Sequence, residues 1–197
     1  MSTEDYLDLR IDDFLDRLAE GGRAPGGGSA AALTVAFAAG LVAMVARCSR
    51  GSWADATGVA AQSLAIKERA AQLARTDADA WQQASAALGE AGTDGDPEGR
   101  DRELEQKLGR AAAVPLEIAE LGADAAALAA LVGEYCEGAY RADAAAAAAL
   151  ASGGASAAAH LVQVNLTVQE GDERLKRARA SEQAAAESAK RTLASIR

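Results

Sequence analysis

The chain has 197 residues, a formal net charge of −9 and a pI near 4.7, and half of its residues are hydrophobic while only 4% are aromatic. Such an acidic chain lacks the basic face that DNA- and RNA-binding proteins turn toward phosphates, so we expect no nucleic-acid partner. Two cysteines, Cys48 and Cys136, and one histidine, His160, supply neither a disulfide framework nor a zinc cluster, so we expect free thiols, a reducing compartment and no metal.

Alanine-rich runs indicate that the whole chain is helical. Residues 144–149 and 184–186 are all alanine, the residue with the highest helix propensity, and almost no segment alternates as a strand does. We therefore predict an all-α fold in which residues 1–197 form a single domain, an antiparallel bundle of about five to seven helices.

The predicted first helix covers residues 4–20 and separates acidic from apolar residues. Acidic residues at the start of the chain are the reverse of the positive charge that begins a signal peptide, so we expect a cytoplasmic protein. The apolar positions recur at helical spacing, at Leu7, Ile11, Phe14, Leu15 and Leu18.

A proline and three glycines then separate this helix from a second, almost uncharged one. They break the helical backbone, and we expect the hydroxyl of Ser29 to cap the helix that follows. That helix is apolar on all sides, which is typical of a helix at the centre of a bundle. Its uncharged stretch, residues 30–46, has only the minimum length that spans a membrane, so we expect a buried helix and no membrane partner.

A third helix, predicted over residues 62–88, carries Asp77 in step with its apolar positions. Residues 89–99 are rich in Gly, Asp and Pro, which is typical of a loop. A fourth helix over residues 100–131 should break or kink near Pro115, because proline has no backbone N–H to donate.

Three more helices are predicted in the last third of the chain. One contains residues 139–150 and should end at Ser152-Gly153-Gly154, and the next covers residues 157–168. The last, residues 173–197, carries seven basic against three acidic residues, whereas residues 4–20 carry two basic against seven acidic. We expect these oppositely charged helices to pack together or to pair between subunits.

Three polar residues in apolar surroundings, Asp77, Asp143 and Asn165, are the candidates for chemistry. A carboxylate on an apolar helix face must be paired, hydrogen-bonded or raised in pKa, and a raised pKa suits a general acid or base. A buried amide must find partners in the protein or in a ligand. The N–H groups at the start of the second helix, beside the three glycines, attract electronegative ligands. The structural alternatives are a simple turn for the glycines and helix–helix polar contacts for the side chains.

Taken in order, these motifs resemble the cyclodeaminase/cyclohydrolase family, the C-terminal domain of formiminotransferase-cyclodeaminase and its free-standing bacterial relatives. The chain departs from the family pattern where Gly51-Ser52-Trp53 replaces basic residues and where Leu161 replaces an asparagine. The resemblance spans most of the chain and rests on Phe14-Leu15, Ala24-Pro25-Gly26-Gly27-Gly28-Ser29, Met44-Val45, Asp77-Ala78-Asp79-Ala80-Trp81, Val114-Pro115-Leu116, Asp143 and Asn165-Leu166.

The resemblance implies a helical bundle that assembles as a homodimer or higher homo-oligomer. It implies a small-molecule folate as partner, with a tetrahydrofolate derivative as substrate and no further cofactor. The reaction is either hydrolysis of 5,10-methenyltetrahydrofolate to 10-formyltetrahydrofolate or deamination of 5-formiminotetrahydrofolate. Because no formiminotransferase domain precedes residue 1, we expect hydrolysis.

Catalysis is assigned through the resemblance to Asp77 and Asp143, which would stabilise a cationic ring or move a proton. The two carboxylates should then converge with the glycine-rich segment on one cleft. A folate-binding relative without turnover and a helical oligomerisation module are the alternatives. The residues implied in substrate binding are Pro25, Gly26, Gly27, Gly28, Ser29 and Asn165.

Overall fold

The computed structural model describes residues 6–20, 25–90, 97–166 and 172–194, with only the backbone of residues 87–90 and 97–106. These ranges contain helices and no strand, which confirms the predicted all-α class. The elements are η1 (Tyr6–Asp8), α1 (Ile11–Ala19), α2 (Gly27–Cys48), α3 (Ala56–Glu90), α4 (Pro97–Tyr135), η2 (Gly138–Tyr140), α5 (Arg141–Asn165) and α6 (Glu173–Ala194).

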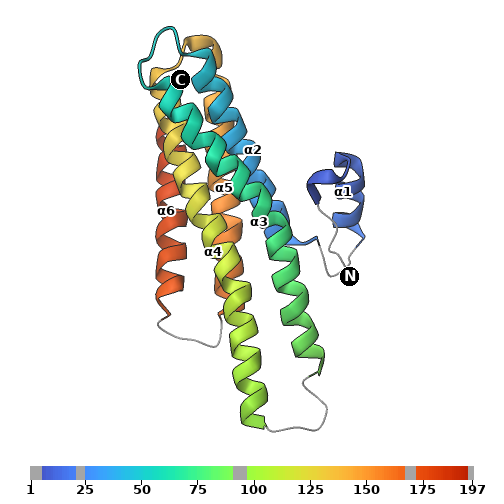
Figure 1. The fold of residues 1–197 in the computed structure, drawn as a ribbon. Coiled ribbons are helices and arrows are strands. Elements are labelled where there is room, and N and C mark those ends of the chain that lie inside the picture. Colours follow the sequence, from blue (N-terminus) through green and yellow to red (C-terminus); the bar gives the residue numbers. More distant parts are fainter. Residues whose placement is uncertain (1–5, 21–24, 91–96, 167–171, 195–197) are drawn as a thin grey trace.

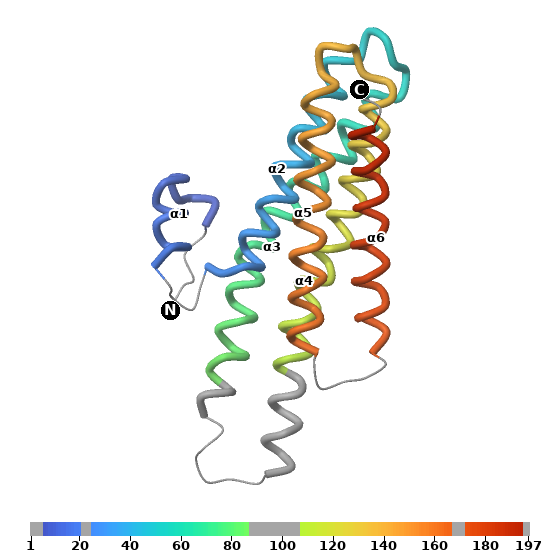
Figure 2. The backbone as a smooth tube through the Cα atoms, turned by 180° about the vertical axis from the view of Figure 1, so that it is seen from behind, coloured from blue at the N-terminus to red at the C-terminus, as the bar shows by residue number. Residues whose placement is uncertain are grey.

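Helices α2 to α6 lie side by side in an elongated bundle, while α1 stands to one side, next to α2 and α3 (Figures 1 and 2). Within the bundle, α2 packs against α3 and α5, and α4 packs against α3, α5 and α6. The start of α2 contacts the middle of α3 through Ser29 and Ala74, and the end of α5 contacts α4 through Asn165 and Ala111.

Small residues allow the helices to approach closely. A Cβ placed at Gly122 of α4 would lie 2.9 Å from the Cβ of Ala155 in α5. A Cβ at Gly154 of α5 would lie 2.7 Å from Val35 Cγ2 and 3.2 Å from the Ala31 carbonyl of α2. The alanine-rich composition thus provides short interhelical distances, and larger side chains fill the remaining space.

The apolar composition of α2 is explained by its place in the core. By length and composition, α2 and residues 138–165 would be long enough to cross a membrane. In α2, however, 61% of the most apolar window is buried against other helices of the bundle. The core helix of a soluble bundle has the same composition, so the structure agrees with the predicted buried second helix.

A predicted helix end at Gly153-Gly154 and a predicted break near Pro115 are absent from the structure. Residues Gly153 and Gly154 lie inside a continuous α5, because Gly154 serves the close contact with α2 rather than a helix stop. Helix α4 likewise runs through Pro115 without a break. The proline leaves the carbonyl four residues earlier, that of Ala111, without its helical donor, and the side chain of Asn165 donates to that oxygen instead, with Nδ2 and O 2.9 Å apart.

The N-terminal helix is also shorter than predicted. The chain forms η1, then α1 from Ile11, and residues 1–5 lie outside the described ranges. Phe14 is buried against Tyr6 and Ala78, but Leu7, Ile11 and Leu15 are exposed. The apolar stripe predicted from the sequence is therefore only partly covered within one chain.

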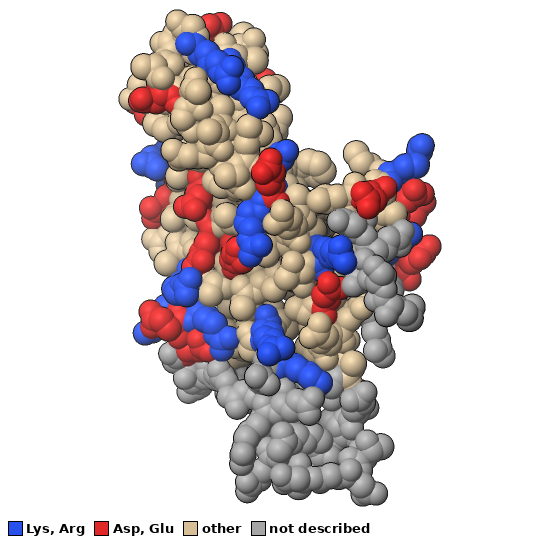
Figure 3. Space-filling view, in the orientation of Figure 1, with Lys and Arg blue, Asp and Glu red and all other residues tan. Residues whose placement is uncertain are grey.

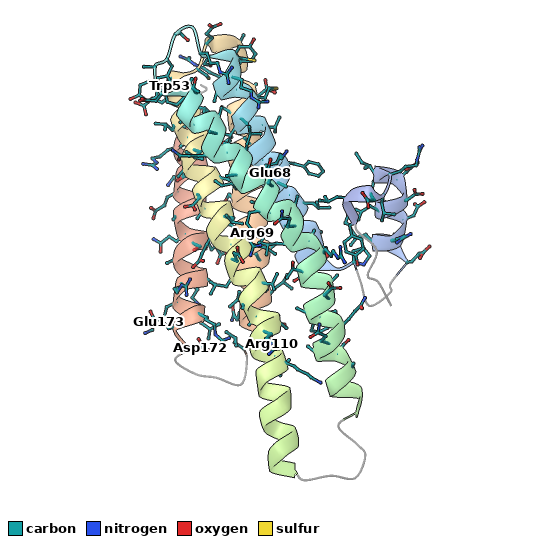
Figure 4. The ribbon with its side chains drawn as sticks, viewed as in Figure 1. Trp53, Glu68, Arg69, Arg110, Asp172 and Glu173 are labelled. Carbon is teal, nitrogen blue, oxygen red and sulfur yellow. The ribbon has the colours of Figure 1, made fainter. Side chains whose placement is uncertain are left out.

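Opposite charges on the bundle surface are interspersed and link neighbouring helices (Figure 3). Arg69 of α3, labelled in Figure 4, binds Glu117 of α4 through two hydrogen bonds of 2.5 and 2.8 Å. Arg177 of the basic α6 forms an ion pair with Glu120 of α4, with Nη2 and Oε1 2.6 Å apart. The basic helix therefore finds its acidic partner in α4, and not in α1, within one chain.

Candidate active site

Ser29 fastens the start of α2 to the middle of α3. Its hydroxyl donates a buried hydrogen bond to the Ala74 carbonyl, with Oγ and O 2.7 Å apart, and its backbone N–H donates to the carboxylate of Asp77. The expectation that the Ser29 side chain caps α2 is wrong, because Gly26 is the N-cap residue and Ser29 lies within the first turn. A carboxylate from another helix therefore satisfies an N–H group that the helix start leaves unpaired.

Gly28 provides the space that the Asp77 carboxylate occupies. A Cβ placed at Gly28 would overlap both carboxylate oxygens and the carboxylate carbon of Asp77. Any residue other than glycine at this position must therefore displace the carboxylate. Gly28 therefore allows the Asp77 side chain to approach the backbone of α2 closely. A Cβ placed at the neighbouring Gly27 would meet only the side chain of Leu161, 3.9 Å away.

The pKa of Asp77 is raised from 3.8 to about 6 by burial, and the hydrogen bond from the Ser29 N–H partly offsets this effect. Burial disfavours the charged form, whereas the N–H groups at a helix start favour it. At neutral pH the carboxylate is therefore mostly ionised, yet it binds a proton far more readily than an exposed aspartate. A carboxylate with this pKa can accept and return a proton near pH 6 to 7.

Asn165 closes the opposite side of the site from the last residue of α5. Its Nδ2 donates to the carbonyl of Ala111, the oxygen that Pro115 leaves without a helical donor. The sequence signals Val114-Pro115-Leu116 and Asn165-Leu166 are thus two halves of one contact between α4 and α5. The proline and the asparagine explain each other's presence.

These groups surround one cavity of about 240 Å³. The glycine segment and Asp77 meet at this cavity, as predicted, and Asn165 joins them from a third helix. Pro25 is buried immediately before the cavity wall begins. The lining residues are Gly26, Gly27, Gly28, Asp77, Trp81, Ala111, Leu161, Val164 and Asn165.

Asp143 lies at the other end of α5 and does not join this cavity. It is the third residue of the helix and Asn165 is the last, so a rise of about 1.5 Å per residue separates them by about 33 Å. Its charge acts on Tyr140, whose pKa is raised first by a hydrogen bond to Cys48 and more weakly by Asp143. The expectation that both carboxylates meet is wrong within one chain, because α5 is one continuous helix that carries Asp143 at its start and reaches the cavity only at its end.

Four further residues line the cavity that were not among the predicted site residues: Trp81, Ala111, Leu161 and Val164. Trp81 follows Asp77 by four residues on α3, so the helical repeat that singled out Asp77 also places Trp81 beside it. Ala111 carries no chemical signal of its own, and its carbonyl becomes relevant only through Pro115. Leu161 replaces an asparagine of the family pattern, which makes this wall apolar.

Among the side chains that the structure describes, no group of three or more His, Cys, Asp or Glu residues is arranged to hold a metal ion. The charged group at the cavity is the Asp77 carboxylate. The arrangement can therefore perform proton transfer and can stabilise a positive charge on a ligand.

Comparisons with known proteins identify the fold and the family of the chain. The chain superimposes on formiminotetrahydrofolate cyclodeaminase from Thermotoga maritima with a TM-score of 0.85 and 20% sequence identity, over 96% of each chain. No curated protein sequence matches the chain. The family model described as Formiminotransferase-cyclodeaminase matches residues 10–185, which is most of the chain. The chain therefore belongs to the formiminotransferase-cyclodeaminase family.

Proposed function

We propose that this protein hydrolyses 5,10-methenyltetrahydrofolate to 10-formyltetrahydrofolate, with Asp77 as the general base. The observation that carries the proposal is the Asp77 carboxylate, whose pKa is about 6, at the wall of a small cavity next to the start of α2. The substrate carries a delocalised positive charge on the carbon bridge between two nitrogens. A carboxylate at the same cavity can attract that cation and activate water beside it.

The reaction requires one water and releases one proton. Water adds to the bridge carbon while Asp77 accepts one proton from it. The bond from this carbon to N5 then breaks as Asp77 returns the proton to N5, and the remaining hydroxyl forms the formyl carbonyl and loses its proton to solvent. Asp77 is regenerated, and this chemistry needs no cofactor besides the folate substrate.

Deamination of 5-formiminotetrahydrofolate is the alternative reaction in the same family. It requires an acid that protonates the departing ammonia, and a carboxyl group with a pKa near 6 is mostly deprotonated at pH 7. The charge state of Asp77 therefore favours hydrolysis. We propose that the reaction takes place in the cytoplasm.

The test follows the loss of methenyltetrahydrofolate absorbance, corrected for spontaneous hydrolysis. Wild type should accelerate the loss, and Asp77→Asn should reduce kcat about 100-fold or more, the usual contribution of a general base. Asp79→Asn is the matched control, because Asp79 lies two residues further along α3 and pairs with Arg75 at 4.0 Å. Ammonia release from the formimino substrate without methenyl hydrolysis would favour the deaminase, and a wild type inactive on both would leave a folate-binding or oligomerisation module.

A further proposal concerns assembly: we propose that a second copy of this chain covers the apolar groove between α2 and α3. The groove has a volume of about 810 Å³, and Phe37 in its wall is 59% exposed. Helix α1 offers a complementary surface, because Ile11 is 71% exposed beside the acidic Asp13 and Asp16. Lys67 at the groove has no ion-pair partner among the described residues. A twofold axis would place each α1 in the partner's groove.

Light scattering tests this assembly directly. Wild type should be a dimer, and Phe37→Asp should be a folded monomer, since a charge at the centre of an apolar interface is costly. Leu193→Asp, which changes an exposed leucine on α6, should remain a dimer. A monomeric wild type, or a dimeric Phe37→Asp variant, would contradict the proposed interface.

A further inference from the structure

Trp81 is an aromatic side chain at the cavity whose ring has no aromatic partner in the described part of the chain. The ring pairs there are Tyr6 with Phe14 and Trp53 with Tyr135. Trp53 stacks on Tyr135, with the ring centroids 5.3 Å apart and the ring planes inclined by 12°. Trp81, in contrast, is 39% exposed and lines the cavity. A large indole left partly uncovered at a cavity is available to a ligand.

The other walls of the cavity favour a flat ligand. A Cβ placed at Gly26 would meet no atom within 4 Å, and one at Gly27 would meet only Leu161, at 3.9 Å. Glycine backbone therefore forms an open, side-chain-free surface, and the apolar Leu161 and Val164 contribute to the same cavity. A planar ring can lie against this surface and the indole without displacing a polar group.

The size of the cavity limits how much of a ligand enters. Its volume of about 240 Å³ is below the roughly 300–1,000 Å³ of pockets that enclose drug-sized ligands. A fused ring with its one-carbon bridge is the part of a folate that such a volume suits. The rest of the bound ligand must therefore extend outside the cavity.

We propose that Trp81 is a specificity-determining residue that stacks on the cationic ring system and favours it over a neutral ring. This inference rests on the proposed folate substrate. The face of an indole carries negative electrostatic potential and attracts a cation above it. The methenyl substrate is cationic on its bridged ring, and the formyl product is neutral there. Trp81 therefore stabilises bound substrate more than bound product, which promotes product release.

Kinetics test the selectivity with two matched variants. Trp81→Leu removes the aromatic face, and Trp81→Phe keeps a smaller one. We expect Trp81→Leu to raise KM for methenyltetrahydrofolate about 10-fold, with a smaller change in kcat, and Trp81→Phe to raise it about 3-fold. The inhibition constant of 5-formyltetrahydrofolate, which has a neutral ring and the same tail, should rise no more than about 3-fold in Trp81→Leu. An unchanged KM in Trp81→Leu, or equal changes for both ligands, would overturn the inference.

Fluorescence gives a readout that does not depend on turnover. In Trp53→Phe the remaining emission comes from Trp81, and in Trp81→Phe it comes from Trp53. Saturable quenching by 5-formyltetrahydrofolate should occur in the first variant and not in the second, after inner-filter correction. Equal quenching in both variants would place the ligand elsewhere. If wild type shows no turnover and Trp81 is still quenched, the proposed reaction fails while the role of Trp81 in binding stands.

Discussion

Ser29 and Asp77 are joined through the Ser29 backbone N–H, which donates to the Asp77 carboxylate, while the Ser29 hydroxyl binds the Ala74 carbonyl one turn earlier on α3. Two bonds from one residue therefore fix both the position of α2 along α3 and the direction of the carboxylate. The structural contact and the proposed catalytic group cannot be separated. Substitutions near this contact consequently test both the fold and the chemistry.

Gly28→Ala should impair catalysis more than folding. The added methyl group overlaps the Asp77 carboxylate and forces it away from the Ser29 N–H. A displacement of about 1 Å at a reacting group lowers the rate by about 100-fold, which we expect in kcat/KM. Gly58→Ala on α3, the helix that carries Asp77, is the control, because a Cβ there meets no atom within 4 Å. Full activity of Gly28→Ala would show that the position of the carboxylate is not important.

The pH dependence of the reaction should follow the ionisation of Asp77. Since the base must be deprotonated, kcat/KM should fall about tenfold per pH unit below pH 6 and be level above it, given the pKa of about 6. The measurement is initial rates from pH 4.5 to 8, each corrected for spontaneous hydrolysis. A profile that is flat through pH 6, or one unchanged in Asp77→Asn, would exclude Asp77 as the base.

The same pKa predicts that Asp77 lowers stability at neutral pH. The pKa of Asp77 in the folded state is about 6, above its ordinary value of 3.8. The folded state therefore binds more protons between these pH values, and stability falls as the pH rises through them. The loss is complete above pH 6 and amounts to about 3 kcal/mol. The free energy of unfolding of Asp77→Asn, relative to that of wild type, should therefore be higher at pH 7.5 than at pH 4. Urea unfolding at both pH values measures this difference, and a difference that is the same at both would contradict the assignment.

Pro115 and Asn165 should be energetically coupled. Asn165→Ala leaves the buried Ala111 carbonyl without a donor and should cost about 1–3 kcal/mol of unfolding free energy. In a Pro115→Ala background, the new backbone N–H can donate to Ala111, so the same substitution should cost about 1 kcal/mol less. Urea unfolding of wild type, both single variants and the double variant gives the coupling energy. Strictly additive costs would mean that the proline and the asparagine are independent.

Two adjacent glycines in α5 should respond in opposite directions to alanine. Gly154→Ala places a Cβ 2.7 Å from Val35 Cγ2 and 3.2 Å from the Ala31 carbonyl, and overpacking of this kind costs about 1–3 kcal/mol. Gly153→Ala meets no atom within 4 Å and should stabilise the helix by about 0.5–1 kcal/mol. Thermal unfolding of both variants checks the pair. Destabilisation by Gly153→Ala would indicate that α5 is interrupted there.

The sequence predicts residues at the cavity where polarity contrasts with the surroundings. Asp77 and Asn165 stand out because their neighbours are apolar at helical spacing, and the structure places both at the cavity. Asp143 does not stand out in the same way, because alanines surround it and any face of that segment looks equally apolar. Periodicity identifies a helix face only where polar and apolar residues alternate, and a run of alanines removes that difference.

Local signals for helix ends fail where another helix supplies the missing partner. Pro115 and Gly154 both indicate an interruption by their own chemistry. In the folded chain Asn165 replaces the lost donor, and Val35 fills the space that glycine leaves. Such compensation depends on residues about 50 to 120 positions away along the chain. Single-helix patterns therefore predict the existence of these helices better than their limits.

The contact between Asn165 and Ala111 also sets the polarity of the cavity wall before any ligand arrives. Because a carbonyl oxygen can only accept, the amide nitrogen must face Ala111, and the side-chain oxygen is the acceptor that remains for a ligand. A ligand ring edge that carries an N–H group can donate to this oxygen, whereas a ring edge that carries only lone pairs is repelled by it. A proline that touches no ligand thus determines which side of an asymmetric ring can face α5.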